Sequence, residues 1–173
     1  SVSRGLGDVY KRQIASSDGK TLYSIADEGV VSFRILPNGS LARLNSAPIR
    51  GMRGCHLCTD EEDKYVFVSG YHDGKTTVLS LNPDGSVGKI VDGVFDRGYG
   101  SVAERNFRPH VTCTRRMPDN RFVLSVDNGI DQVKIYRFND KEQRLVQVDA
   151  IRCELESAPC LLYTSDAADD RIS

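Results

Sequence analysis

Residues 106–138 read NFRPHVTCTRRMPDNRFVLSVDNGIDQVKIYRF. Two segments of this stretch, 121–126 and 132–138, are rich in β-branched and aromatic residues that alternate with polar ones. Between them lies DNGID, residues 127–131, whose residue types favour a turn. Two such segments joined by a short turn predict an antiparallel β-hairpin.

Two further strands are expected beside this hairpin. One is the segment 110–114, which is separated from the hairpin by MPDN at 117–120, where Pro, Asp and Asn favour a tight reversal. The other is the apolar segment 145–148. Four consecutive antiparallel strands form a meander, which is the blade unit of a β-propeller.

Two weaker copies of this pattern precede it in the chain. Lys20, Lys64 and Arg121 occupy one position of the repeat, at spacings of about 44 and 57 residues, and the first spacing is typical of propeller blades. The first copy is expected to keep only its later strands. Helical periodicity is nearly absent, so the sequence predicts an all-β fold, a propeller fragment of about three four-stranded blades. The expected blades are 14–50, 51–105 and 106–158.

The longer second spacing indicates an insertion. Residues from about 91 to 107 are rich in Gly, Arg and Asp without an apolar period, and are expected to form a loop. Arg115 and Arg116 are expected to be solvated loop charges. Asp127 and Asp131 are expected to bond turn backbone as Asx motifs.

Both ends of the chain are interpreted as translated sequencing-adapter DNA, at residues 1–13 and 160–173. Val9 to Gln13 can be encoded by GTG TAT AAG AGA CAG, whose reverse complement, read one base out of frame, encodes Cys160 to Tyr163. The native part is therefore expected to be an interior piece of a longer gene, from 14 to 159, and adapter residues are excluded from fold reasoning.

Composition narrows the function classes further. With 23 basic and 24 acidic residues, the chain shows no preference for nucleic acid or membrane. The native thiols, Cys55, Cys58, Cys113 and Cys153, lack a disulfide-scaffold spacing, and we expect free cysteines in a cytoplasmic protein. Cys55 and Cys58 have the spacing of half a zinc site, but a second half is missing, so no metal is expected.

The repeat also predicts where several polar residues lie in the fold. His56 and His110 open the first strand of successive blades, and the first strands of a propeller line its central channel. Arg53, Arg105 and Arg108 lie close to them in sequence. We expect these five side chains to gather around one mouth of the channel.

The stretch 106–138 resembles the lactonase family of seven-bladed propellers, which includes 6-phosphogluconolactonases and carboxymuconate-lactonising enzymes. In addition, GCHL at 54–57 resembles the family's P-C-H-L, and SVAERNF at 101–107 resembles its Glu-Arg segment. The resemblance covers 14–159, about three of seven blades. Its motifs in 106–138 are Pro109-His110, Pro118-Asp119-Asn120, Asp127, Gly129-Ile130-Asp131 and Val133-Lys134-Ile135-Tyr136.

The resemblance implies hydrolysis of a small anionic sugar lactone, with 6-phosphogluconolactone as the first candidate and no cofactor. His110 is the implied base, because an imidazole titrates near working pH. Arg105 and Arg108 would bind the phosphate or carboxylate of the substrate. The remaining implied substrate-binding residues are His56, Arg53 and Glu104, and further family residues, a Glu and an Arg, are expected on later blades.

Other interpretations of the same residues stay open. The histidines can be structural, the arginines can be solvated charges, and the propeller can be a binding module without chemistry. A muconate-type cycloisomerase is the nearest enzymatic variant. An arc of three blades exposes apolar faces, so the isolated chain is expected to be inactive and to self-associate through them.

Overall fold

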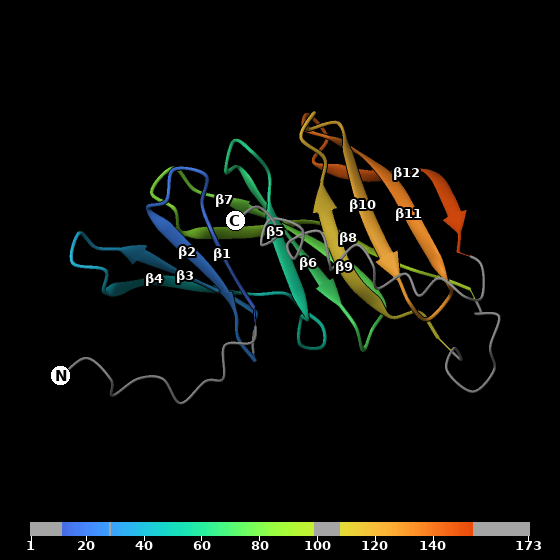
Figure 1. Ribbon diagram of the computed structural model, residues 1–173, viewed down its shortest axis with the longest axis horizontal. Helices are drawn as coiled ribbons and strands as arrows, with labels where there is room; N and C mark the ends of the chain where they lie inside the picture. Colours follow the sequence, from blue (N-terminus) through green and yellow to red (C-terminus); the bar gives the residue numbers. More distant parts are fainter. Residues whose placement is uncertain (1–11, 28, 99–107, 154–173) are drawn as a thin grey trace, which may run out of the picture.

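In the part of the chain that the structure describes, three four-stranded sheets lie next to one another. A computed structural model describes residues 12–27, 29–98 and 108–153, and Figure 1 shows the sheets succeeding one another along the chain. Each sheet is an antiparallel meander in which consecutive strands are neighbours. The described residues contain no helix, and so none long and apolar enough to cross a membrane. The all-β prediction is confirmed.

The first sheet contains one strand more than the sequence predicted. Gln13 to Ala15 pair with Ser24 to Leu22, so the first copy keeps a short first strand that begins at Gln13. Three residues are too few to give an alternating strand pattern of their own, and the hydrogen bonds of the ladder need no particular side chain. The strands are β1 (Gln13–Ala15), β2 (Thr21–Ile25), β3 (Gly29–Ile35) and β4 (Leu41–Pro48).

The second sheet corrects the loop expected from about residue 91 to 107. Residues 91–95 belong to a strand in which Thr76 pairs with Val94 and Thr77 with Gly93. Pairing with a buried neighbour overrides the weak strand propensity of Asp92 and Gly93. Residues 99–107 lie outside the described part of the chain. The strands are β5 (His56–Thr59), β6 (Tyr65–Gly70), β7 (Lys75–Leu81) and β8 (Val87–Phe95).

The third sheet confirms the hairpin predicted around residues 127–131. Its first strand extends further than expected, to Arg116, whose side chain is buried rather than solvated. The fourth strand is also longer than the segment 145–148. The strands are β9 (Val111–Arg116), β10 (Phe122–Asp127), β11 (Gln132–Asn139) and β12 (Arg144–Arg152).

Equivalent turns confirm the repeat. The turns between the first and second strands, β1–β2, β5–β6 and β9–β10, all contain a backbone N–H bonded to a carbonyl three residues earlier. The donors of these bonds, Gly19, Asp63 and Asn120, adopt positive φ of 67°, 52° and 53°. Lys20, Lys64 and Arg121 each follow such a donor and precede the second strand, which places the three in one repeat position.

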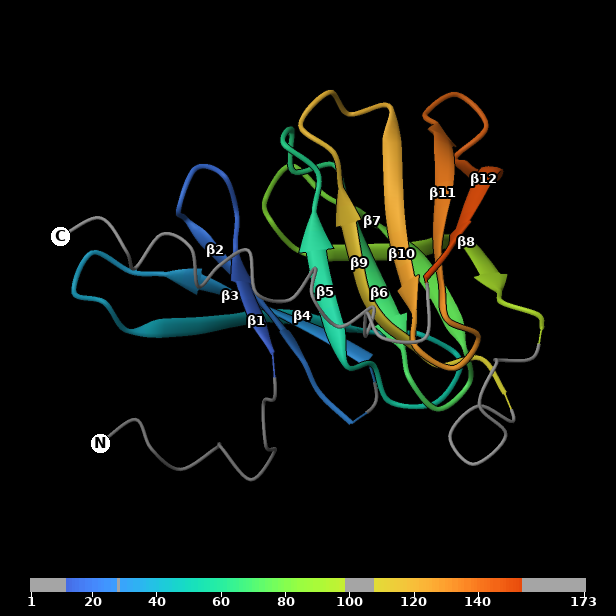
Figure 2. The same ribbon diagram turned by 45° about the vertical axis from the view of Figure 1, so that its right-hand side comes forward.

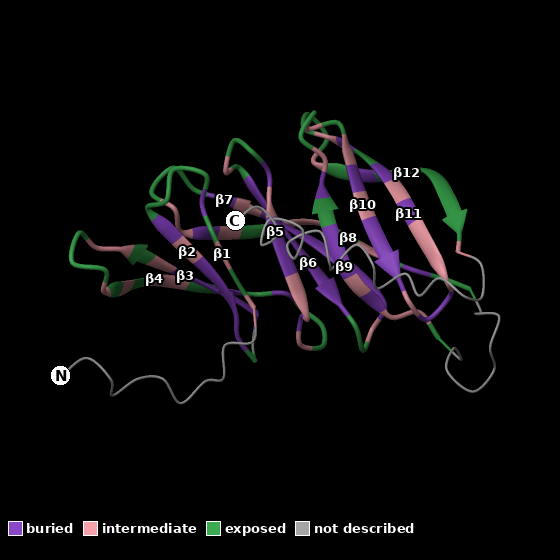
Figure 3. Cartoon of the chain, in the orientation of Figure 1, coloured by how far each residue is buried: buried purple, intermediate pink, exposed green. Residues whose placement is uncertain are grey.

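Successive sheets pack face to face. The faces of the first and second sheets share one apolar cluster, which includes Tyr23, Ile25, Val66 and Leu79. The side chain of Asn45 reaches across this junction, where it accepts the N–H of Val87 at 2.9 Å and donates to its carbonyl at 2.7 Å. In Figure 3 the buried segments concentrate on the inner strands, and exposed ones on β4 and β12.

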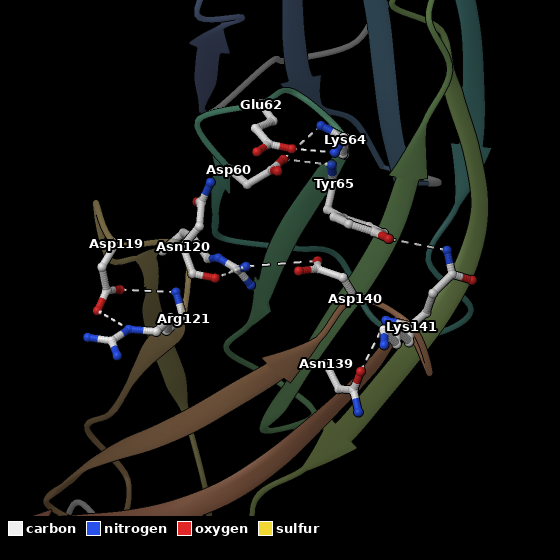
Figure 4. Close-up of polar contacts among 12 residues, drawn as sticks. Asp60, Glu62, Lys64, Tyr65, Asp119, Asn120, Arg121, Asn139, Asp140 and Lys141 are labelled. Carbon is white, nitrogen blue, oxygen red and sulfur yellow. Dashed lines mark hydrogen bonds and ion pairs between the residues drawn. The ribbon is translucent and has the colours of Figure 1, made fainter.

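The second and third sheets share another cluster, centred on aromatic rings. Phe67 and Phe138 meet edge to face at 5.6 Å between ring centroids. The Arg116 guanidinium lies 5.1 Å from the centroid of Phe138 and donates to the carbonyl of Asn120. Tyr65 accepts a hydrogen bond from Gln143 at 3.3 Å, and Figure 4 shows the polar rim of this junction. Arg116 therefore forms part of the blade junction.

Replacing Phe67 by Ala should destabilise the fold by about 3–5 kcal/mol, because Phe67 is fully buried between two sheets and its loss leaves a cavity. Phe95→Ala is the matched control. Phe95 is 60% exposed and contacts the Lys75 ammonium, so its loss should cost less than about 1 kcal/mol. Urea denaturation followed by circular dichroism measures both, and equal costs would contradict the packing described.

Candidate functional site

The innermost strands of the three sheets line one hollow. Figure 2 shows β1, β5 and β9 on the same side of the sheets, and residues of all three strands surround a hollow of about 390 Å³. His56 belongs to this lining, and its Nε2 lies 3.8 Å from the Sγ of Cys113 on β9. The first strands of the blades thus form a common wall.

His110 lies directly before β9, and its backbone is fixed on two sides. Its N–H donates to Oδ1 of Asp127 at 2.8 Å, and its carbonyl accepts the N–H of Asn128 at 3.0 Å. A Cβ at Gly129 would lie 2.1 Å from the carbonyl oxygen of Arg108, and one at Gly74 2.6 Å from the Cβ of Pro109. Two hairpin turns from neighbouring blades therefore hold the segment 108–110 at close range, and glycine permits both approaches.

The imidazole of His110 is oriented by Tyr71. The two rings are stacked, with 4.3 Å between centroids and an interplanar angle of 11°. Nδ1 of His110 lies 2.6 Å from the carbonyl oxygen of Tyr71. Because a carbonyl oxygen can only accept, Nδ1 carries the hydrogen, and in the neutral ring Nε2 keeps a lone pair that can accept a proton.

Both predicted histidines lie at the same end of the β5–β6 hairpin. His56 pairs with Ser69, and Tyr71, two residues further along the chain, contacts the His110 ring. His72, which follows Tyr71, is exposed. The structure therefore brings the two imidazoles to one rim of the inner wall.

The predicted arginines have different environments. Arg108 is exposed beside this rim. The guanidinium of Arg53 forms an ion pair with Asp27 at 2.6 Å, which links the second blade to the first. Glu104 and Arg105 lie outside the described residues.

The sequence did not predict a buried polar cluster that contacts the backbone of His110. Asp96, directly after β8, accepts a hydrogen bond from the Tyr136 hydroxyl at 2.9 Å and forms an ion pair with Lys134 at 3.0 Å. Asp127 at the end of β10 is its second carboxyl group. All four residues are nearly inaccessible to solvent. The spacing of polar residues on β11 gave no signal for this cluster, because its partner Asp96 lies in a segment that was expected to be a loop.

Burial and the neighbouring carboxyl group determine the protonation of this cluster. Loss of hydration raises the pKa of Asp127 to about 7, and the hydrogen bond and negative charge of Asp96 act in the same direction, while the N–H groups of His110 and Gly129 oppose them. Burial and the Asp96 charge also raise the pKa of Tyr136, which stays protonated as a donor.

The thiols show no metal-binding arrangement within the described part of the chain. The described cysteines form no disulfide, as predicted; Cys58 and Cys113 are buried, and Cys55 and Cys153 are partly buried. No group of three or more His, Cys, Asp or Glu side chains gathers there in a way that could hold a metal ion. Burial raises the pKa of the Cys55 thiol to about 11 and that of Cys58 to about 12, so both are poor nucleophiles near neutral pH.

The family model of a lactonase, a seven-bladed β-propeller, matches residues 13–160. The chain belongs to this lactonase propeller family. It is 33% identical over 133 residues to the 6-phosphogluconolactonase of Bacillus subtilis strain 168, an alignment that covers 73% of the chain and 38% of that relative. The chain therefore spans well under half the length of this curated relative of the lactonase propeller family.

Solved structures agree with this family. A putative 6-phosphogluconolactonase from Bacteroides fragilis superposes with a TM-score of 0.77 at 28% identity, covering 86% of the chain and 45% of that structure. A periplasmic gluconolactonase of Pseudomonas aeruginosa superposes with a TM-score of 0.72 at 22% identity, covering 80% of the chain and 44% of that structure, and shows the fold alone. Three blades of this lactonase propeller thus match somewhat less than half of a complete one.

His110 should populate the Nδ1–H tautomer when neutral, because the Tyr71 carbonyl accepts that hydrogen. Long-range ¹H–¹⁵N correlation spectra of the imidazole rings at pH 8 distinguish the two tautomers. The exposed His72 is the internal reference, and it should show the Nε2–H form preferred by a free imidazole. A dominant Nε2–H form at His110 would contradict the assigned orientation.

Proposed function

We propose that the protein to which these blades belong hydrolyses a small anionic sugar lactone, with 6-phosphogluconolactone as the first candidate. Membership of the lactonase family and the named Bacillus subtilis relative support the reaction class. The observation that carries the proposal is the His110 imidazole, whose Nδ1 faces a backbone carbonyl while Nε2 keeps its lone pair. This is the arrangement that a general base requires.

In the proposed reaction His110 activates water. Nε2 accepts a proton from a water molecule as its oxygen attacks the lactone carbonyl, and negative charge develops on the carbonyl oxygen. Collapse of the tetrahedral intermediate breaks the bond between the acyl carbon and the ring oxygen. The imidazolium returns the proton to the leaving alkoxide, and the product is a hydroxy acid. The Tyr71 carbonyl stabilises the imidazolium through the hydrogen bond to Nδ1.

The anionic group of the substrate needs a cation at the same rim. We assign Arg108 to it, because this guanidinium is exposed directly beside Pro109 and His110, and guanidinium geometry matches phosphate. Arg105 and Glu104 stay in the proposal as its neighbours in sequence. Arg53 is oriented by Asp27, and His56 lies on the channel wall. Their proposed role is to contact the sugar hydroxyls.

Replacing His110 by Ala in the full-length protein should lower kcat for 6-phosphogluconolactone by about 10²–10⁴-fold, because the general base is lost. KM should change much less. Lys141→Ala is the control, since Lys141 is exposed on the turn between β11 and β12, and it should leave both constants unaltered. Unchanged turnover in the His110 variant removes the assigned base, and absence of lactonase turnover in the unaltered protein favours the binding-module interpretation.

We also propose that the 173-residue chain self-associates through β12. Val146, Val148 and Ile151 on β12 are 51%, 44% and 53% exposed, and β12 is an edge strand of its sheet. Exposed apolar side chains on an open edge promote pairing with a second copy.

The double substitution Val146→Lys and Val148→Lys should reduce this association, because charge on an edge strand opposes pairing. Met52→Lys is the control, since Met52 is 54% exposed but lies between β4 and β5. Sedimentation velocity over a concentration series measures the mass distribution. A concentration-independent monomer of the unaltered chain would contradict self-association.

A further inference from the structure

Two carboxyl groups meet in the core between the second and third blades. Asp127 and the Asp96 side chain are both 0% exposed, and the neighbouring Asp96 carboxyl group raises the pKa of Asp127. The Oδ1 atoms are well supplied with donors. That of Asp96 receives the Tyr136 hydroxyl and the Lys134 ammonium, and that of Asp127 receives three backbone N–H groups.

The two Oδ2 atoms, in contrast to the Oδ1 atoms, lack donors within the described part of the chain. Each is buried, and neither Oδ2 has a donor partner among the described residues. A buried carboxylate oxygen without a donor is costly. A single proton between the two Oδ2 atoms supplies the missing donor to one and gives the other a partner.

The local charges lead to the same conclusion. Among the described residues, two ionised carboxylates would face the Lys134 ammonium, which forms an ion pair with Asp96. Like charges in contact in a buried site do not both ionise near neutral pH. One retained proton balances the single ammonium against a single negative charge.

Asp127 also connects this pair to the proposed base. Its Oδ1 accepts the N–H of His110 at 2.8 Å, that of Gly129 at 2.8 Å and that of Ile130 at 3.2 Å. One oxygen atom thus fixes both the β10–β11 turn and the residue that precedes β9. The backbone N–H of Asp96 donates to the Gly74 carbonyl at 2.8 Å, on the other turn against which the segment 108–110 packs.

We propose that Asp127 is a positioning residue for His110, and that it holds His110 in place as half of a carboxyl pair that shares one proton with Asp96. The catalytic part of this proposal rests on the proposed function, whereas the shared proton and the anchored backbone do not.

The proposal gives a pH dependence with a defined sign. Asp127 ionises near pH 7 in the folded chain and near its ordinary value of about 3.9 in the unfolded chain. The stability that its bound proton contributes is therefore present below pH 4 and is lost as the pH rises from about 4 to 7. Above pH 7 Asp127 is ionised next to Asp96, and the groups around the pair are Lys134, the Tyr136 hydroxyl and the N–H groups of His110 and Gly129. These N–H groups favour the ionised form, so the stability that is lost belongs to the carboxyl pair and not to the anchor of His110.

Asp127→Asn tests the shared proton. The amide keeps an oxygen for the three N–H groups and places an NH₂ where the proton lies, so it imitates the protonated acid at every pH. In the full-length protein, the fall in melting temperature between pH 5 and 8 should become smaller than in the unaltered protein. The hydrogen-exchange protection of the His110 amide should stay high at pH 8, because the amide oxygen still accepts its N–H.

Asp127→Ala tests the anchor, because it removes the acceptor of three backbone N–H groups. Protection of the His110 amide should fall at least tenfold, and kcat should fall at least tenfold with less than a threefold change in KM. Asp84→Asn is the matched control, since Asp84 is an exposed turn carboxyl that accepts the N–H of Ser86, and it should alter none of these readouts. If Asp127→Ala does not fold, the melting temperatures and hydrogen-exchange protection of Asp127→Asn test the proposal instead.

Two results overturn the proposal. One is an Asp127→Asn protein whose melting temperature follows the same pH dependence as that of the unaltered protein. The other is an Asp127→Ala protein with unchanged protection of the His110 amide. Failure of the proposed function has a different signature, because His110→Ala would then retain full turnover while the exchange and melting results for the Asp127 variants persist.

Discussion

Face-to-face packing of successive sheets is the constraint on which the rest of this structure depends. A meander of four short strands cannot bury enough apolar surface alone, and each blade of a propeller gains its core from its neighbours. The middle blade shows this most clearly, because every residue of β6 is buried. Both faces of this strand are covered, so alternation between apolar and polar residues is replaced by a nearly continuous apolar segment.

Hydrogen bonds between hydroxyl groups also fix how the second and third blades pack. Ser69 donates to Thr114 at 2.8 Å, and the hydroxyls of Thr76 and Ser125 lie 3.1 Å apart, all buried between the second and third blades. A buried hydroxyl is tolerated when it has a partner. These pairs help to fix the position of β9 relative to β6, and therefore the position of His110 relative to Tyr71. The junction between the second and third blades thus contributes to the precision of the candidate site.

Local patterns predicted much of this arrangement. The hairpin around Gly129, the equivalence of Lys20, Lys64 and Arg121, and the common rim of His56 and His110 all follow from short segments whose turn chemistry is explicit. The predictions were wrong where strand pairing or packing between distant segments decided the local structure. Residues 91–95 join β8 through hydrogen bonds to β7, and Arg116 is buried because two aromatic rings from different blades cover it.

The sequence by itself determined the all-β class, the blade repeat and the family, because alternation, turn residues and motifs are properties of neighbouring residues. Only the tertiary structure decided which polar groups meet. Asp96 and Asp127 are far apart in sequence and lie on different blades. The residues around one of them do not indicate that the other lies close to it. Their contact, their burial and the proton that they share follow from the angle at which one sheet packs on the next, a quantity that no local pattern encodes.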